Sequence, residues 1–373
     1  MDLEKKFWKP SVTSQFFHCP VPFHMDTYRG CLYNCSYCFA RDFVTFSRRN
    51  SEHKEFQYLV GNRADLLKNW IERTLKKEYD YNKAEEVAFK ERIPLKIGAT
   101  ADPFPRNIEE KERVTYGALK VLHEYDYPVE IQTKNPEVLA SYAEEFIGAN
   151  WTIAVTLIST DEDFVRVCEP QAPTAKSRLD AIKKLTDLGF YVMVKIQPAI
   201  YPKILTDLPE MVKAIKEAGV WAFNIEGLKI RITMPESERK IMQTIGEYLD
   251  MDIREFYKNE RQFGAKGSSD YELSPTKKEE FIFLADSLAK EYGLKFYNAD
   301  NHLVKVGAGC ECCGTEVLRD YKLLGCDSRS ILFENEKGSK ELEKCFVNFV
   351  RNNTHKGKTI CEACSCKNGG YLK

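Results

Sequence analysis

The sequence contains no run of about 18 apolar residues, which is the length that a helix needs to cross a bilayer. Its beginning mixes acidic and basic side chains without an apolar segment, so we expect no secretory signal there. Neither sign of charge is in excess, because 55 Lys and Arg residues oppose 56 Asp and Glu residues for a net charge of -1. These absences argue against a membrane protein and against a surface that binds polyanions throughout, although a local basic patch is compatible with them. We therefore predict a cytoplasmic protein.

The composition is that of a folded chain that is rich in cysteine. Of the 373 residues, 43% are hydrophobic and 30% are charged, which suits a large core and a solvated surface. In a reducing compartment, 13 cysteines indicate bound metal rather than disulfides. Three of them lie at positions 31, 35 and 38, eight lie between positions 310 and 366, and only Cys19 and Cys168 stand alone.

Short apolar segments alternate with amphipathic segments through the middle of the chain. We predict strands at 24–29, 94–98, 128–133, 151–157, 190–196 and 220–225. We predict helices at 63–77, 109–125, 136–146, 174–188 and 206–218. Strands separated by helices of this length form parallel sheets, so the pattern predicts an α/β protein with a partial (β/α)6 barrel of the TIM type.

The alternation changes after residue 232. Helices are expected at 235–250 and 275–292, the second with Ser274 as its N-cap and Gly293 after its last turn, and a last strand is expected at 295–300. We expect an N-terminal extension at 1–20, the barrel at 21–232, a helical extension at 233–300 and a small cysteine-rich, metal-binding C-terminal module at 301–373.

The first cysteine cluster has the spacing C-x3-C-x2-C, formed by Cys31, Cys35 and Cys38. Three thiolates do not complete a tetrahedral structural zinc site, but they can hold three corners of a [4Fe–4S] cluster and leave the fourth iron open. Aromatic side chains on both sides of the third cysteine, Tyr37 and Phe39, can shield such a cluster from water. The spacing therefore predicts a cluster with one open coordination position.

This motif, placed after the first strand of a predicted barrel, resembles the signature of radical S-adenosylmethionine (SAM) enzymes. The resemblance implies that the amino and carboxylate groups of SAM bind the open iron, and that an electron donor such as flavodoxin or ferredoxin reduces the cluster. SAM is then cleaved to a 5′-deoxyadenosyl radical, which abstracts hydrogen from the substrate. Within this superfamily the chain resembles the spore photoproduct lyase-like group over about residues 20 to 230. The matching segments are 38–41, 98–103, 133–134, 168–173 and 197–202.

The resemblance also implies a set of polar residues at the carboxyl ends of the strands, where barrels build their active sites. Asp102 is expected near the amino end of SAM, and Lys134 is expected to pair with its carboxylate. Thr156 ends the next strand, where this family places a hydroxyl group. Glu169 and Gln197 follow as further polar candidates for cofactor binding.

One departure from the lyase pattern concerns the substrate half of the reaction. The lyase has a catalytic cysteine in a Cys-Thr-Ser-Asp segment, and this chain has Ala99-Thr100-Ala101-Asp102 instead. Cys168 does not match that position, and we expect it to be a small buried residue rather than a hydrogen donor. The lyase reaction itself is therefore not implied, and no catalytic residue for the substrate is predicted.

The C-terminal cysteines suffice for two four-ligand sites, or for one site with spare thiols. Thiolates suit both zinc and iron–sulfur clusters, so an auxiliary cluster and a structural zinc both stay open, with the cluster preferred. We expect His302 and His355 to be surface residues. The candidate ligands are Cys310, Cys312, Cys313, Cys326, Cys345, Cys361, Cys364 and Cys366.

Two classes of function compete at this point. The first is a radical SAM enzyme that acts on a nucleic acid, a peptide side chain or a small metabolite, with nucleic acid weakly favoured by the lyase-like segments. A peptide-modifying enzyme with an auxiliary cluster is one version of it. The second is a metal-stabilised nucleic-acid-binding protein without catalysis, motivated by a basic tail at 351–373. The intact cysteine motif favours the enzyme.

Overall fold

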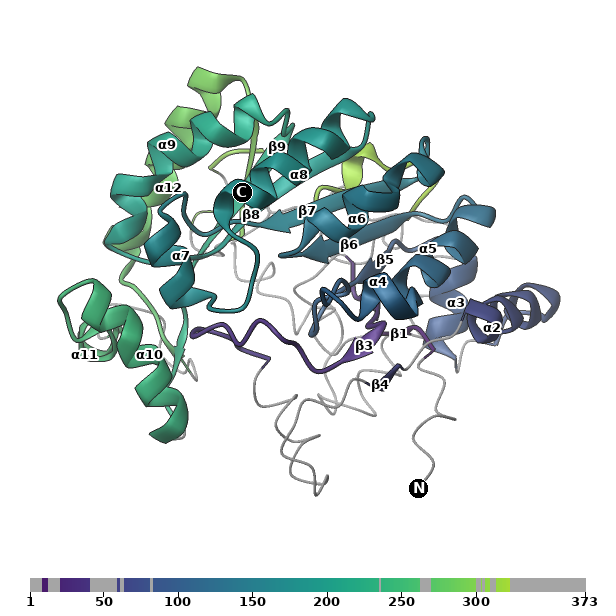
Figure 1. Cartoon of the computed structure of the whole chain (residues 1–373), viewed down its shortest axis with the longest axis horizontal. Coiled ribbons are helices and arrows are strands. Elements are labelled where there is room, and N and C mark those ends of the chain that lie inside the picture. Colours follow the sequence, from purple (N-terminus) through teal and green to yellow (C-terminus); the bar gives the residue numbers. More distant parts are fainter. Residues whose placement is uncertain are drawn as a thin grey trace.

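The centre of the molecule is one eight-stranded sheet (Figure 1). The computed structural model describes residues 9–12, 21–40, 59–60, 64–80, 83–234, 236–261, 270–299, 303, 306–308 and 313–322. The strands of this sheet follow the order β1 (Ser11–Val12), β2 (Phe23–Met25), β5 (Leu95–Ile97), β6 (Val129–Thr133), β7 (Trp151–Thr156), β8 (Tyr191–Ala199), β9 (Ala222–Gly227) and β12 (Lys295–Asn298). Two small antiparallel pairs lie beside it: β3 (Tyr28–Arg29) with β4 (Leu59–Val60), and β10 (Ile230–Arg231) with β11 (Asp270–Tyr271).

The pairing confirms the predicted partial barrel. From β2 to β12 every neighbouring pair is parallel, and only the edge strand β1 runs antiparallel, against β2. All six predicted barrel strands are present. The strand predicted at 295–300 is also present as β12, and it pairs with β9 as a seventh parallel strand of the same sheet.

The helices surround the sheet: most cover its outer face, and two at 236–260 lie to one side of it (Figure 1). They are α2 (Ala64–Lys76), α3 (Ala84–Lys90), α4 (Glu109–Glu112), α5 (Val114–Glu124), α6 (Pro136–Tyr142), α7 (Glu162–Cys168), α8 (Ala175–Asp187), α9 (Lys203–Glu217), α10 (Glu236–Tyr248), α11 (Ile253–Glu260) and α12 (Pro275–Tyr292). Three short helices, α3, α7 and α11, were not predicted, because segments of seven or eight residues carry too few turns for a clear periodicity. The helix expected at 109–125 is divided at Arg113, whose φ of 51° lies in the left-handed region.

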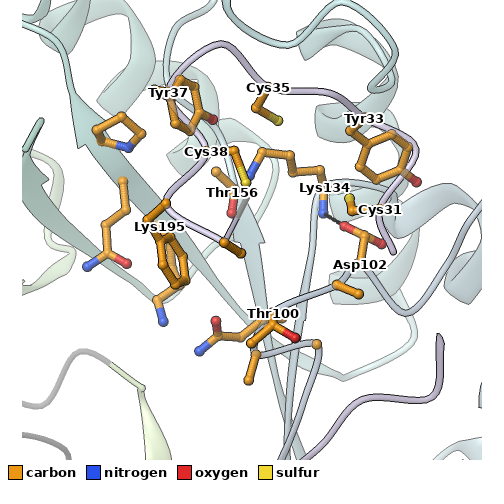
Figure 2. A pocket seen from close by; sticks show the side chains of 18 of the residues that line it. Cys31, Tyr33, Cys35, Tyr37, Cys38, Thr100, Asp102, Lys134, Thr156 and Lys195 are labelled. Atoms are coloured by element: carbon orange, nitrogen blue, oxygen red, sulfur yellow. Dashed lines mark hydrogen bonds between the residues drawn. The ribbon is translucent and has the colours of Figure 1, made fainter. Parts of the chain in front are cut away.

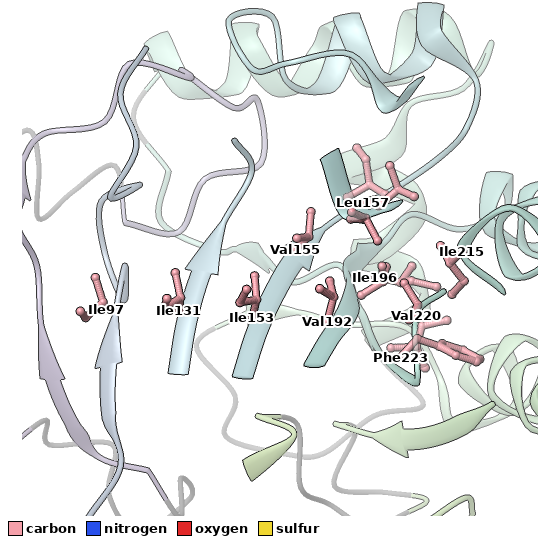
Figure 3. Packing of buried hydrophobic residues seen from close by; sticks show 14 of the residues in the cluster. Ile97, Ile131, Ile153, Val155, Leu157, Val192, Ile196, Ile215, Val220 and Phe223 are labelled. Atoms are coloured by element: carbon pink, nitrogen blue, oxygen red, sulfur yellow. The ribbon is translucent and has the colours of Figure 1, made fainter. Parts of the chain in front are cut away.

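Side chains alternate along each strand between the helices and the interior of the barrel. On the helix side lie Ile97, Ile131, Ile153 and Val192, which pack in one hydrophobic core with Ile215 of α9 (Figure 3). The opposite positions are largely polar: Lys96, Glu130, Thr152, Lys195 and Asn224. The apolar layer therefore joins sheet and helices, and the barrel interior is left for polar groups.

The segment 313–322 closes the amino end of the barrel. The backbone N–H and C=O of Arg319 are both bonded to the Asn150 side chain, at 2.8 and 2.9 Å, just before β7. Gly314, with a φ of 59°, lies so close to Met193 and Trp221 that a Cβ there would be 2.7 Å from the methionine sulfur. The base of the barrel is thus sealed by a segment that follows β12. None of the helices described here is long and apolar enough to span a membrane.

Candidate functional site

A cavity of about 290 Å³ lies at the carboxyl ends of the strands (Figure 2). It is bounded by the cysteine loop, by the loop after β5, and by the ends of β6, β7, β8 and β9. Seven of the eight residues predicted for the cluster and SAM in the barrel line it, and the eighth, Glu169, lies behind its wall. The seven are Cys31, Cys35, Cys38, Asp102, Lys134, Thr156 and Gln197.

The cysteine loop is held in place by bonds from its backbone and its polar side chains. Tyr33 donates its hydroxyl hydrogen to the carbonyl of Phe104 at 2.8 Å. Ser36 donates from its backbone N–H to the carbonyl of Cys168 at 2.8 Å, and from its hydroxyl to the carbonyl of Val167 at 2.9 Å. The loop is therefore anchored to the segment after β5 on one side and to the end of α7 on the other.

The three thiols of the loop form one electrostatic group. Burial, and then the nearby Asp102 carboxylate, raise the pKa of Cys31 to about 11. Burial also raises the pKa of Cys35, while the Lys134 ammonium beside it acts in the opposite direction. Both Cys31 and Cys38 add to the rise at Cys35, so the thiols lie close enough to affect one another. A bound metal would reverse these shifts by stabilising the thiolates.

Within the described part of the chain, no three Cys, His, Asp or Glu side chains converge on a single metal ion. A four-iron cluster does not need such convergence, because each thiolate binds a different iron. Figure 2 shows the three cysteines distributed around the Lys134 side chain. Three neighbouring thiols around a cavity therefore fit a cluster with an open corner better than they fit a single ion.

Asp102 joins two of the loops that form the cavity. Its carboxylate accepts the Thr133 hydroxyl at 2.9 Å and the backbone N–H groups of Phe104 and Lys134 at 3.0 and 2.6 Å. Burial raises its pKa, and these three hydrogen bonds oppose the rise. The side chain fixes the end of β6, and therefore the position of Lys134, relative to the loop after β5.

Glu169 belongs to a buried ionic network beneath the cysteine loop. Its carboxylate lies 2.5 Å from Nη2 of Arg178 and 3.7 Å from Nζ of Lys134, and it accepts the Tyr37 hydroxyl. Burial alone would raise its pKa, but Arg178 and Lys134 hold the pKa below its ordinary value. Arg178 also donates to the carbonyl of Thr156 at 2.9 Å. Glu169 therefore positions Tyr37 and Lys134 from behind the cavity wall.

A second buried network, in the barrel interior, was not predicted. The Glu130 carboxylate lies 3.4 Å from Nζ of Lys96 and 3.5 Å from Nζ of Lys195, and it accepts Nε2 of Gln132 at 2.5 Å. Lys195 and Gln132 also line the cavity. A sequence signal for this network exists, since three predicted strands each carry one charged residue inside an apolar segment.

Glu130 makes the stability of the fold depend on pH. Burial, and then the neighbouring Cys313, raise its pKa from 4.5 to about 7 against the opposing effect of Lys96 and Lys195. The folded state therefore holds this proton more tightly than the unfolded state, and its contribution to stability is lost as pH rises from about 4.5 to about 7. We therefore expect the difference in unfolding free energy between Glu130→Gln and wild type to shift in favour of the variant by roughly 2 kcal/mol as pH rises from 5 to 8. Urea unfolding across this range measures the difference, and a constant difference would contradict the assignment.

Gly98 begins the loop that carries Asp102. Its φ is +91°, and a Cβ there would collide with the backbone oxygen of Gln132 and lie 2.8 Å from the Pro103 ring. Gly189 has a similar φ of +88° with open space around it, so it is a matched control. We expect Gly189→Ala to cost about 1 to 2 kcal/mol and Gly98→Ala to cost about 1 to 3 kcal/mol more. Thermal or urea unfolding measures both losses of stability. If Gly98→Ala and Gly189→Ala lost the same stability, the close approach of Gly98 to Gln132 would be unimportant.

The remaining cysteines fall into two groups. Cys168 is fully buried and does not line the cavity, and its role in the site is the carbonyl that holds Ser36. Of the C-terminal candidates only Cys313 lies within the described residues, where it is buried near Val21. The other candidate ligands lie outside the described residues: Cys310, Cys312, Cys326, Cys345, Cys361, Cys364 and Cys366. His302 and His355, expected to be surface residues, also lie outside them.

A parallel partial barrel with a cysteine loop and polar strand ends around one cavity defines a class of cofactor-dependent enzyme. The sequence model of the Radical SAM superfamily matches residues 25–205, from β2 into α9. This span contains the cysteine loop and all five predicted cofactor-binding residues. Residues 25–205 therefore carry a radical SAM domain, and this superfamily implies a [4Fe–4S] cluster and SAM as cofactors.

Among solved structures, the fold is similar to that of spore photoproduct lyase. The lyase complexed with dinucleoside spore photoproduct is 12% identical, with a TM-score of 0.54 over 79% of this chain and 80% of that chain. A mutant of the lyase with bound AdoMet and dinucleoside spore photoproduct is 13% identical, with a TM-score of 0.53 over 78% and 79% of the two chains. At this identity the likeness concerns the fold.

The curated relatives are proteins without an assigned function. An uncharacterized protein of Mycobacterium tuberculosis, Rv2578c, is 26% identical over 222 residues, which cover 57% of this chain and 60% of the relative. An uncharacterized protein of Acidianus two-tailed virus, ORF301, is 28% identical over 93 residues, 24% of this chain and 29% of the viral protein. The matched segments thus span between about a third and three fifths of these relatives.

Proposed function

We propose that the protein cleaves SAM reductively and uses the resulting radical to abstract hydrogen from a substrate held in the cavity. The observation that carries this proposal is the shared lining of one cavity by three loop cysteines and by polar residues from the ends of four parallel strands. Cys31, Cys35 and Cys38 would hold a [4Fe–4S] cluster through their thiolates. Bound there and reduced, this cluster would supply the electron that converts SAM to methionine and a 5′-deoxyadenosyl radical.

The residues around the cluster would bind and orient SAM. The Lys134 ammonium, which lies beside Cys35 and 3.7 Å from the Glu169 carboxylate, would pair with the SAM carboxylate. Asp102 would act mainly by fixing the loop and the backbone of Lys134, since its oxygens already accept three hydrogen bonds. Thr156 and Gln197 add polar groups at the ends of β7 and β8.

Two aromatic residues of the loop, Tyr33 and Tyr37, would keep water from the cluster, whereas Phe39 is 64% exposed and does not fit the shielding role predicted for it. Tyr33 is almost fully buried, and Tyr37 is bonded to the buried Glu169. Because both hydroxyl groups are held by protein acceptors, their rings have a fixed orientation at the cavity wall. A dry and rigid wall favours radical chemistry, since a reactive intermediate is then protected from side reactions.

The substrate is not identified by these residues. Nucleic acid is weakly favoured, because the similar lyase structures contain a dinucleoside photoproduct. Ala99 stands where the resemblance to the lyase predicts its catalytic cysteine, so this chain would treat its product radical differently. A flavodoxin or ferredoxin would serve as electron donor, and the C-terminal cysteines would hold a second cluster or zinc.

The proposal is tested with protein purified and reconstituted without oxygen. We expect 5′-deoxyadenosine after addition of SAM and dithionite. Metal analysis should give about four irons per chain for one cluster, and about eight irons, or four irons with zinc, if the C-terminal cysteines also bind metal. Absence of 5′-deoxyadenosine in protein that contains the cluster would overturn the proposal.

A further inference from the structure

We propose that the floor of the cavity, formed around Lys195, binds an anionic oxygen group of the substrate, either a carboxylate or a phosphate. This inference deepens the proposed function and rests on it for the identity of the bound molecule as a substrate. The binding site itself follows from the placement of Lys195, Glu130 and Gln132. It is separate from the position of Lys134, which the cofactor is proposed to use.

Lys195 combines burial with access to the cavity. It lies in the middle of β8, where it pairs with Thr156 of β7 and Asn224 of β9. Only 5% of its surface is exposed to solvent, yet it lines the cavity together with Gln132. In Figure 2 it lies apart from Cys35, on strands that form the floor of the site. A buried lysine that faces a cavity is suited to hold a ligand rather than to increase solubility.

The charges around Lys195 favour an anion. Its ammonium lies 3.5 Å from a Glu130 oxygen, while the other Glu130 oxygen lies 3.4 Å from the Lys96 ammonium. The three side chains together carry two positive charges and one negative charge, a formal net charge of +1 when Glu130 is ionised. Because interactions between charges are strong in a buried environment, an anionic group beside Lys195 is stabilised there.

The acidic residues that line the cavity are used in other interactions. Among the described lining residues these are Asp102, with its three hydrogen bonds, and Glu226, whose carboxylate lies 2.6 Å from Nζ of Lys229. Gln132 donates to the same Glu130 carboxylate and thereby fixes the polar floor next to Lys195. The floor therefore presents a positioned cation that an incoming oxygen group can reach from the cavity.

A purely structural role for Lys195 makes a different prediction. If Lys195 only neutralised Glu130, the wild-type floor would not bind an anion, and Lys195→Met would have no anion binding to lose. If Lys195 binds an anion, Glu130 competes with that anion for the ammonium group. Glu130→Gln should then tighten anion binding, while Lys195→Met should abolish it.

The test is isothermal titration calorimetry on the reconstituted full-length protein, with inorganic phosphate or acetate at matched ionic strength. We expect Lys195→Met to weaken binding at least about tenfold, Glu130→Gln to tighten it severalfold, and Lys213→Met, on the exposed side of α9, to leave it unchanged. A preference for phosphate or for acetate identifies the anionic group of the substrate. If Lys195→Met does not fold, as judged by circular dichroism, Glu130→Gln decides the question.

Three results would overturn the inference: no anion binding by wild type, equal binding by Lys195→Met, or weaker binding by Glu130→Gln. Loss of anion binding in the presence of SAM would also overturn it, because Lys195 would then belong to the cofactor site. The titration needs neither reductant nor turnover. Formation of 5′-deoxyadenosine in the same preparations tests the proposed function separately, so either proposal can fail alone.

Discussion

Replacing any one of Cys31, Cys35 and Cys38 by alanine is expected to lower 5′-deoxyadenosine formation by at least about a hundredfold. Changes that do not touch a metal ligand directly already cost about 10- to 100-fold in metal affinity or activity, and removal of a ligand should cost more. The iron content and the visible absorbance of the cluster should fall together with the product. Both quantities are measured on protein reconstituted without oxygen.

The matched control for this experiment is Cys168→Ala. The Cys168 thiol is fully buried behind the cysteine loop. The contact of Cys168 with Ser36 is made by its backbone carbonyl, which accepts the Ser36 N–H and which alanine retains. We expect this variant to bind the cluster and to form 5′-deoxyadenosine at a rate close to wild type. If Cys168→Ala lost the cluster and one of the three loop variants kept it, the ligand assignment would be wrong.

Arg178→Met is expected to have the largest effect on stability. Arg178 and Glu169 are both fully buried, and their side chains lie 2.5 Å apart. Removal of the arginine leaves a buried carboxylate whose one remaining ion pair among the described residues is with the more distant Lys134 ammonium, and breaking a buried pair in this way costs about 3 to 5 kcal/mol. Urea unfolding measures the loss, and Lys184→Met, on the exposed side of the same helix, is the control with little expected effect.

The double variant Arg178→Met with Glu169→Leu separates the ion pair from the packing of the helix. Because it removes both charges, it should recover a large part of the stability lost in Arg178→Met. Unlike Arg178→Met, it should also bind the cluster less stably than wild type, since the Tyr37 hydroxyl loses its Glu169 acceptor and the cysteine loop loses one of its contacts. Stability of the double variant no better than that of Arg178→Met would indicate that Arg178 acts through packing or through its bond to Thr156.

These experiments address two parts of the site with different proposed roles, one in forming the radical and one in selecting the substrate. The half that would generate the radical consists of the cysteine loop, Lys134 and Asp102, and it lies within the residues that the superfamily's sequence model matches. The half that would select the substrate includes the cavity floor around Lys195. Fold likeness to a lyase at 12% identity does not define that floor, so its chemistry has to come from the residues of this chain.

The sequence alone was sufficient for features that depend on neighbouring residues. The three cysteines lie within eight positions, and their spacing is a local property of one loop. The strands and most helices of the barrel have patterns of period two or about 3.6, which predicted their order and the parallel sheet. The polar residues at the strand ends could be placed at one rim, because carboxyl ends of parallel strands share an edge.

Only the tertiary structure brought together groups from distant segments. Lys96, Glu130 and Lys195 come from three strands, and their contact depends on the register in which β5, β6, β7 and β8 pair. Arg178 lies on a helix with the pattern of a surface helix, and it reaches Glu169 only because α8 packs against the end of α7. β12 joins β9 through pairing over some 70 residues of chain, a contact that no local periodicity encodes. Local spacing thus determined the chemistry of the cysteine loop, and through-space packing determined which charges lie in and beneath the cavity.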